Sequence, residues 1–175
     1  MKIETTNLTG VLVITPEVFS DSRGFFLESF SAKKYKENGI NFDFVQDNIS
    51  RSSKGVLRGL HFQKANPQGK LVSCLRGAVF DVAVDLRKDS NTFSNYFAIE
   101  LTDTNHKQLW IPPGFAHGFC VLSNSADFHY KCTSFYDAKD ESGIIWNDPE
   151  INIDWPIDNP LISNKDRMLK KLNEL

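Results

Sequence analysis

The residues of this chain best suited to chemistry gather in two short, glycine-flanked motifs. The first is Arg58-Gly59-Leu60-His61-Phe62-Gln63, with Lys70 soon after it, and the second is Pro113-Gly114-Phe115-Ala116-His117-Gly118. Histidine is the side chain that ordinarily titrates nearest neutral pH. Together these residues supply a candidate base, two fixed positive charges and a second imidazole. Such a set suits an anionic substrate that must lose a proton.

His61 is the first candidate for the base. A lone histidine in a strand is usually structural, but here Gly55 and Gly59 bracket the approach, so the backbone can come close to a ligand. If the segment is extended, His61 and Gln63 share one face of the strand. These features favour a functional histidine.

His117 follows a Pro-x-Gly-x-x-His pattern, in which a turn would raise the imidazole at the mouth of a barrel. The alternative is a buried histidine bonded to a backbone carbonyl. The pattern matches the second metal-binding motif of cupins, which makes iron or zinc worth considering. The first cupin motif needs a His-x-His pair and a later glutamate, and this chain has His61-Phe62-Gln63 there. Because a first-row metal would lack a full set of ligands, we expect no metal.

Polar residues in three other segments suit a nucleotide-like ligand. Lys70 begins an apolar strand and can point into a barrel mouth. Arg23 has the planar fork that fits phosphoryl oxygens, and Phe26 offers a stacking face, with Glu28 in the same segment. The alternative is a surface turn with an apolar anchor. Gln46-Asp47-Asn48 supplies donors and acceptors for the edge of a base or sugar.

Tyr130 and Tyr136 lie on an expected strand over 128–136, where even positions share a face. They would therefore point the same way, although a tyrosine of the core or rim is the plainer interpretation. Asp166, in a short helical segment, would ordinarily be a surface residue.

The composition indicates one ordinary globular domain over residues 1–175. Hydrophobic residues make up 41%, charged residues 24%, and the net charge is −2. This charge provides no field for nucleic acid or an anionic membrane. Three cysteines without CxxC spacing indicate free thiols. With no signal peptide or membrane-length apolar run, we expect the cytoplasm.

Short apolar strands recur between polar turns, which indicates an antiparallel sandwich, jelly roll or barrel with small helices at its edges. A helix is expected over 31–38, with Ser31 placed to cap it and Gly39 to stop it. Another is expected over 163–172, where Ser163 before Asp166 resembles a capping box. The expected strands are 10–15, 70–76, 79–86, 96–101, 108–111, 119–122 and 128–136.

Taken together, these motifs resemble the nucleotide-sugar epimerases of the dTDP-4-dehydrorhamnose 3,5-epimerase family. The resemblance extends from about residue 10 to Asp166. It is carried by the segments 21–28, 44–50, 57–63, 69–72, 79–87, 108–119, 130–131 and 145–149.

The resemblance implies an all-β, cupin-like jelly roll that works without metal or cofactor as a homodimer. It implies that His61 is the general base, Tyr130 the general acid, Lys70 the residue near the sugar keto oxygen, and Asp166 the partner of the base. The segment with Arg23 and Glu28 would cross into the neighbouring subunit's site. Candidate contacts to a nucleotide diphosphate sugar are Arg23, Phe26, Glu28, Gln46, Asp47, Asn48, Arg58, Lys70, His117, Tyr136, Glu141 and Lys165.

The expected reaction is epimerisation at C3 and C5 of dTDP-4-dehydro-6-deoxyglucose. Alternatives are inversion at C3 or C5 alone, or action on a GDP-linked keto-heptose, since these enzymes share the acid and the base. Phe135 stands where the family often has tyrosine, which bears on the choice of nucleotide. More distant alternatives are a nucleotide-sugar-binding cupin without activity, a metal-dependent cupin oxygenase and a ketoisomerase.

Overall fold

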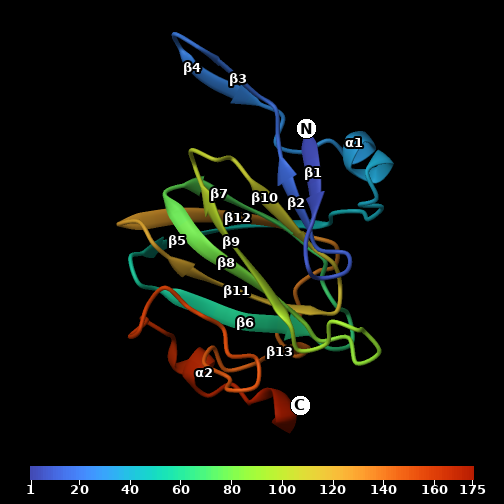
Figure 1. Ribbon diagram of the computed structural model, residues 1–175, viewed down its shortest axis with the longest axis vertical. Coiled ribbons are helices and arrows are strands. Elements are labelled where there is room, and N and C mark those ends of the chain that lie inside the picture. Colours follow the sequence, from blue (N-terminus) through green and yellow to red (C-terminus); the bar gives the residue numbers. More distant parts are fainter.

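Two antiparallel β-sheets face each other in the computed structural model, which describes residues 1–175 (Figure 1). The strand order is β1-β2-β10-β7-β12-β5 in the six-stranded sheet and β13-β6-β11-β8-β9 in the five-stranded sheet. Strands distant in sequence are neighbours in both sheets, as in a jelly roll. The predicted all-β fold with small helices is therefore confirmed.

The elements have these bounds: β1 Lys2–Thr5, β2 Leu12–Thr15, β3 Val18–Asp21, β4 Gly24–Leu27, α1 Ala32–Glu37, β5 Gln46–Ser53, β6 Leu57–Gln63, β7 Lys70–Arg76, β8 Ala78–Asp85, β9 Tyr96–Thr102, β10 Gln108–Ile111, β11 Phe115–Val121, β12 Ser125–Cys132, β13 Glu141–Gly143, α2 Asn164–Arg167 and the 3-10 helix η1 Leu172–Glu174. No helix of the chain is long and apolar enough to cross a membrane.

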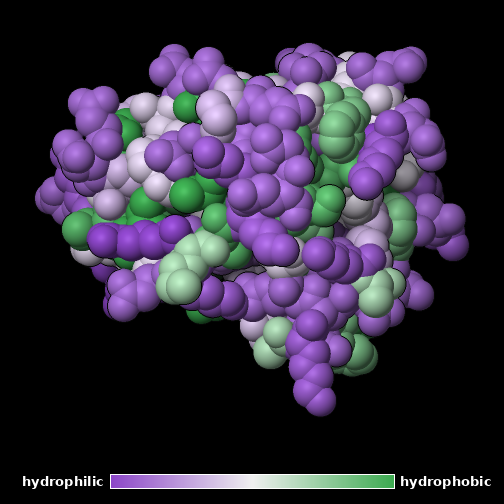
Figure 2. Space-filling view, turned by 90° about the horizontal axis from the view of Figure 1, so that it is seen from below, coloured by the Kyte–Doolittle hydropathy of each residue, from purple (hydrophilic) through white to green (hydrophobic).

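The core lies in layers because β8 is buried on both faces. Val79 and Ala83 point between the sheets into the main cluster, which also holds Phe128. Val82 and Val84 point to the other side, where the C-terminal segment covers the five-stranded sheet. The face formed by that segment is mostly hydrophilic, with apolar side chains in separate spots (Figure 2).

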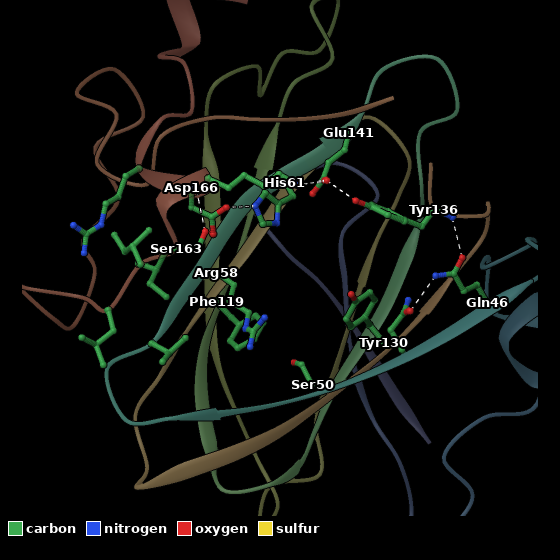
Figure 3. A pocket seen from close by; sticks show the side chains of 17 residues that line it. Gln46, Ser50, Arg58, His61, Phe119, Tyr130, Tyr136, Glu141, Ser163 and Asp166 are labelled. Carbon is green, nitrogen blue, oxygen red and sulfur yellow. Dashed lines mark hydrogen bonds and ion pairs between the residues drawn. The ribbon is translucent and has the colours of Figure 1, made fainter. Parts of the chain in front are cut away.

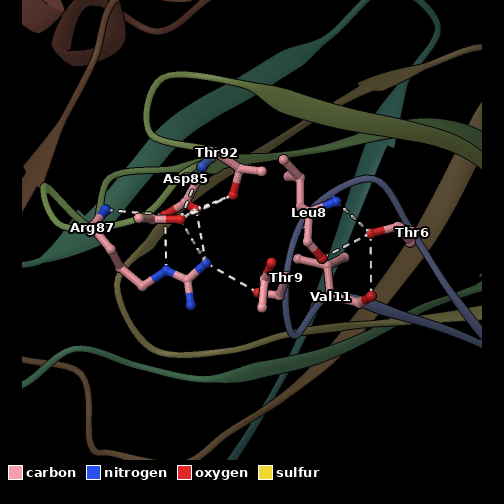
Figure 4. A network of polar contacts seen from close by, with 8 residues as sticks. Thr6, Leu8, Thr9, Val11, Asp85, Arg87 and Thr92 are labelled. Atoms are coloured by element: carbon pink, nitrogen blue, oxygen red, sulfur yellow. Dashed lines mark hydrogen bonds and ion pairs between the residues drawn. The ribbon is translucent and has the colours of Figure 1, made fainter.

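The end of β8 is fixed by a network around the buried carboxylate of Asp85 (Figure 4). Asp85 accepts hydrogen bonds from Arg87, Ser90 and Thr92. Arg87 also donates to the carbonyl oxygen of Thr9 at 3.0 Å. These bonds connect the loop after β8 to the N-terminal segment.

The hairpin of β3 and β4 extends away from the sandwich (Figure 1). Its aromatic side chains Phe19, Phe25 and Phe26 are 57%, 60% and 68% exposed. In its own chain, Phe25 contacts the ring of His106, with 4.6 Å between centroids. The hairpin thus presents apolar side chains that the rest of the chain leaves largely uncovered.

Three of the expected elements are wrong in extent. The strand expected over 119–122 is β11, which already begins at Phe115. The second helix, expected over 163–172, ends at Arg167, because Lys170 instead forms a bridge with Ile144. The strand expected over 128–136 is β12, which ends at Cys132, so Tyr130 and Tyr136 do not share a strand.

The first helix agrees more closely with its prediction. Ser31 is its N-cap residue, but the Ser31 side chain makes no capping hydrogen bond. Gly39 follows the helix with φ +91°, a conformation that favours glycine. The three cysteines are free and buried, as predicted.

Candidate active site

A histidine–carboxylate pair forms the centre of the site. Nε2 of His61 lies 2.7 Å from Oδ1 of Asp166. The second oxygen of Asp166 accepts a hydrogen bond from the backbone N–H of Gly59 at 3.3 Å. Burial would raise the pKa of the Asp166 carboxyl, but these hydrogen bonds outweigh it, so the pKa is lowered. Asp166 therefore stays ionised beside the imidazole.

Asp166 reaches His61 because its helix is capped. The Ser163 side chain accepts a hydrogen bond from the backbone N–H of Asp166 at 3.0 Å. The predicted cap is thus present, whereas the Asp166 carboxylate turns to His61 rather than back to the cap. A capping serine typically contributes about 1 kcal/mol, which matters for a helix of four residues.

A bulge brings Arg58 and His61 to the same cavity. β11 pairs with β6 at His117↔His61 and at Phe119↔Arg58, with a shift of register between the pairs. Between these pairs, Gly59 and Leu60 of β6 thus lie opposite Gly118 of β11 alone. Strict alternation would put Arg58 and His61 on opposite faces, and the shift allows both to line the same cavity.

Tyr130 stands on the opposite sheet. It extends from β12 of the six-stranded sheet, whereas His61 belongs to β6 of the five-stranded sheet. Both line one cavity of about 720 Å³ (Figure 3). Burial raises the pKa of Tyr130, so its phenol remains protonated at neutral pH. A cavity of this size can hold a small ligand, with a potential base on one wall and a potential acid on the other.

Five other predicted contact residues also line this cavity. Tyr136 donates from its hydroxyl to Glu141 at 2.6 Å, and Lys165 forms an ion pair with the same carboxylate. The Gln46 side chain accepts from the backbone N–H of Tyr136 at 2.8 Å and donates to Asn48 at 3.0 Å. These bonds fix a polar rim that continues from the His61–Asp166 pair (Figure 3).

Glu141 is the electrostatic centre of that rim. Burial would raise the pKa of its carboxyl, but the bonds from Lys165 and Tyr136 outweigh it and lower the pKa. Its charge is therefore balanced within the chain. Arg58, by contrast, donates through Nε to the neutral Ser52 hydroxyl at 3.1 Å. The Arg58 charge remains available to an anionic ligand.

Lys70 and His117 lie deeper than the sequence suggested. Neither lines the cavity, and both are buried. His117 stands within β11 rather than in a turn, because the turn at Gly114 comes before the strand. Its Nε2 lies 2.8 Å from a carboxylate oxygen of Asp81, not near a backbone carbonyl. The expected turn at His117 is therefore wrong.

No group of three or more His, Cys, Asp or Glu side chains is arranged to hold a metal ion. His61 and His117 each direct one ring nitrogen to a carboxylate instead.

Comparison with known proteins identifies the family. The family model described as dTDP-4-dehydrorhamnose 3,5-epimerase matches residues 5–174. A Shigella flexneri dTDP-4-dehydrorhamnose 3,5-epimerase is 55% identical over 168 residues, which cover 95% of this chain and 93% of that protein. The chain belongs to this family.

A solved structure and a more distant relative add detail. A Legionella pneumophila dTDP-6-deoxy-D-glucose-3,5-epimerase, crystallised with dTDP-4-keto-L-rhamnose, superposes with a TM-score of 0.96. It is 52% identical, over 98% of this chain and 93% of its own. A Streptomyces niveus dTDP-4-dehydrorhamnose 3-epimerase is 40% identical over 95% of this chain and 82% of that protein. The sequence identity of this chain is therefore higher to these two enzymes, named as 3,5-epimerases, than to this relative, named as a 3-epimerase.

Four predicted contact residues of this epimerase-family chain lie away from the cavity. Asp47 points to the other face of β5, where Lys131 donates to it at 2.8 Å. Arg23 and Phe26 belong to the projecting hairpin, and Glu28 follows it and pairs with Lys34. Within one chain, these four residues do not meet His61.

The sequence reasoning missed some residues that line the cavity. Ser50 continues the alternation of Gln46 and Asn48 along β5, a signal that could have revealed it. Arg167 follows Asp166 directly, and no pattern distinguished it. Apolar side chains also border the cavity, namely Val56, Leu57, Phe119, Leu161 and Ile162.

Proposed function

We propose that this chain converts dTDP-4-dehydro-6-deoxyglucose into dTDP-4-dehydrorhamnose by inverting C3 and C5. One observation carries the mechanism: an imidazole and a phenol from opposite sheets line one cavity. A proton removed on one side of a sugar ring can thus be replaced from the other side. Family membership supplies the substrate class.

The 4-keto group makes this chemistry accessible. Loss of the hydrogen on C3 or C5 leaves an electron pair that spreads onto the carbonyl oxygen as an enolate. His61 accepts the proton at its free nitrogen, while Asp166 fixes the tautomer and stabilises the imidazolium that forms. A positioned base of this kind contributes typically about 10²–10⁴-fold.

Tyr130 then donates its phenolic proton to the same carbon from the opposite face, which inverts the centre. The enolate collapses to the ketone, and Tyr130 and His61 exchange protons with water before the next event. Each inversion replaces one proton by another, so it is redox-neutral. Lys70 is the proposed cation for the developing oxyanion, where a preorganised donor contributes roughly 3–4 kcal/mol.

The nucleotide part of the substrate fits the polar rim. The free charge of Arg58 suits a diphosphate oxygen, and Gln46 and Asn48 present amide groups. Tyr136 is half exposed, with its ring anchored by Glu141, so it offers a stacking face. The proposed ligand is therefore a nucleotide diphosphate sugar, with the hexose between His61 and Tyr130.

We also propose that the chain acts as a homodimer whose hairpins are exchanged. The exposed Phe19, Phe25 and Phe26 lie on a hairpin that extends away from its own sandwich. A second copy would cover these rings and bring Arg23 and Phe26 to its partner's cavity. The free, buried cysteines support location in a reducing compartment such as the cytoplasm.

Deuterium exchange tests the proposed function. The native protein, incubated with dTDP-4-dehydro-6-deoxyglucose in heavy water, should incorporate deuterium at both C3 and C5, read separately by NMR. His61→Ala should slow incorporation at both carbons by about 10²–10⁴-fold. Tyr130→Phe should block inversion while proton exchange continues. Deuterium at one carbon alone would indicate a single-centre enzyme, and undiminished uptake by His61→Ala would remove His61 as the base.

A further inference from the structure

A buried group of charged side chains lies outside the cavity lining. Lys70 of β7, Asp81 of β8 and His117 of β11 are 9%, 0% and 7% exposed. Asp81 Oδ1 lies 2.8 Å from His117 Nε2. The other oxygen, Oδ2, is buried and has no hydrogen-bond partner. A buried carboxylate oxygen without a partner is costly, so a purely structural pair would not explain this arrangement.

Lys70 is the complementary unpaired group. Burial lowers the pKa of its ammonium, and its charge is influenced by Cys132, Asp81 and Glu141, without any hydrogen bond. Burial raises the pKa of the Cys132 thiol, so the thiol is neutral near pH 7. Glu141 is already bonded to Lys165 and Tyr136. Of the groups acting on Lys70, Asp81 is thus the carboxylate without a cation of its own.

His117 does not cancel the charge of Asp81. Burial lowers the pKa of His117, an effect that Asp81 opposes and that Lys70 and His61 reinforce. A neutral imidazole donates its Nε2–H to Asp81 and leaves the negative charge in place. Phe128 stacks on the His117 ring, with 5.9 Å between centroids, and limits its movement.

We propose that Asp81, through its unpaired Oδ2, is a positioning residue for the buried Lys70 and holds its positive charge ready for the oxygen that becomes negative when a proton leaves. The inference rests on the proposed function, because it acts through Lys70. This role would explain why Oδ2 of Asp81 is buried without a hydrogen-bond partner. Lys70 would then already carry its positive charge when the enolate forms, and would not have to take up a proton first.

The test removes the charge of Asp81 but keeps its shape. In Asp81→Asn the pKa of Lys70 should fall, so the alkaline limb of the kcat–pH profile should move to lower pH. Above that limb, kcat should drop roughly tenfold for each pH unit of displacement. Affinity for dTDP should change less than about twofold, because a charge outside the cavity lining contributes little to nucleotide contacts. NMR of lysine labelled at Cε, with the Lys70 signal assigned from Lys70→Arg, follows the titration directly.

Asp85→Asn is the matched control. Asp85 is an equally buried carboxylate on β8, but its bonds go to Arg87, Ser90 and Thr92. This variant should lower stability without moving the alkaline limb. A second control is the double variant Lys70→Arg/Asp81→Asn, where a permanently charged guanidinium should remove any displacement of the limb.

Three results would overturn the inference. One is an unmoved limb in Asp81→Asn with kcat reduced equally at every pH. Another is an equal displacement in the Lys70→Arg background. The third, which applies even if Asp81→Asn does not fold, is a native Lys70 that is already neutral at pH 7. Failure of the proposed function is distinct from all three, because the native protein would then not epimerise the substrate.

Discussion

Replacing Asp166 by asparagine tests whether the histidine–carboxylate pair does the work assigned to it. The substitution keeps the size of a side chain that is 5% exposed, and whose Oδ1 lies 2.7 Å from Nε2 of His61. It removes the negative charge that would face the imidazolium. It also allows the amide to donate toward His61, which favours the wrong tautomer for a base.

The size of the effect follows from the geometry. Two unit charges about 4 Å apart interact by about 4 kcal/mol at an effective dielectric constant of 20. The His61 side chain is 28% exposed, so solvent screens part of this energy. A remaining loss of roughly 3 kcal/mol corresponds to a decrease of about 10²-fold in kcat.

The assay is the rate of deuterium incorporation at C3 and C5 under saturating substrate, with binding of dTDP measured separately. Asp154→Asn, which changes an exposed aspartate that does not line the cavity, is the control. In Asp166→Asn the rate of deuterium incorporation should fall, whereas the affinity for dTDP should be retained. A folded Asp166→Asn protein that exchanges within about threefold of the native rate would refute the role of the pair.

Three other predictions concern the support of this pair. Gly59→Ala should lower the free energy of unfolding by at least roughly 1–3 kcal/mol, measured by urea unfolding, because a Cβ at φ +116° would lie 2.6 Å from the Cα of Gly118. Ser163→Ala should cost about 1 kcal/mol in the same assay and reduce kcat, while Ser31→Ala, which loses no capping bond, should change little. The pKa of the Asp166 carboxyl is lower in the folded protein than in the unfolded chain. Ionised Asp166 therefore stabilises the fold at any pH above the ordinary pKa of an aspartate, and this stabilisation is lost as the pH falls through the pKa of the folded state. The stability difference between native protein and Asp166→Asn should accordingly shrink in acid, and a difference that grows there would contradict the sign.

The strand pattern and the cavity residues were largely predictable from sequence. Alternating apolar residues identified most strands, and the motif with His61 pointed to a residue that lines the cavity. The position of Asp47 could have been predicted from the alternation of side chains along a strand. It stands between Gln46 and Asn48, and successive residues of a strand face opposite sides, so all three could not reach one cavity from the same strand.

Other features depend on contacts that sequence spacing does not reveal. Arg58 and His61 line one cavity because β6 and β11 shift register, and a bulge depends on the partner strand. His117 contacts the carboxylate of Asp81 on β8, which lies 36 residues away in the chain. The unpaired oxygen of Asp81 depends on the packing of three strands. These are tertiary effects, and local propensity contains no information on them.

The proposed catalytic pair of His61 and Asp166 depends on the part of the fold that is least stable on its own. A helix of four residues such as α2 has no stability of its own in water. It is held by Ser163, by the bridge of Leu161 with Val56 and by the bridge of Lys170 with Ile144. Segments held by few contacts open at lower free energy than a central sheet. Asp166 should therefore leave His61 before the sandwich unfolds, so mild denaturant should reduce activity before it changes the β-sheet signal.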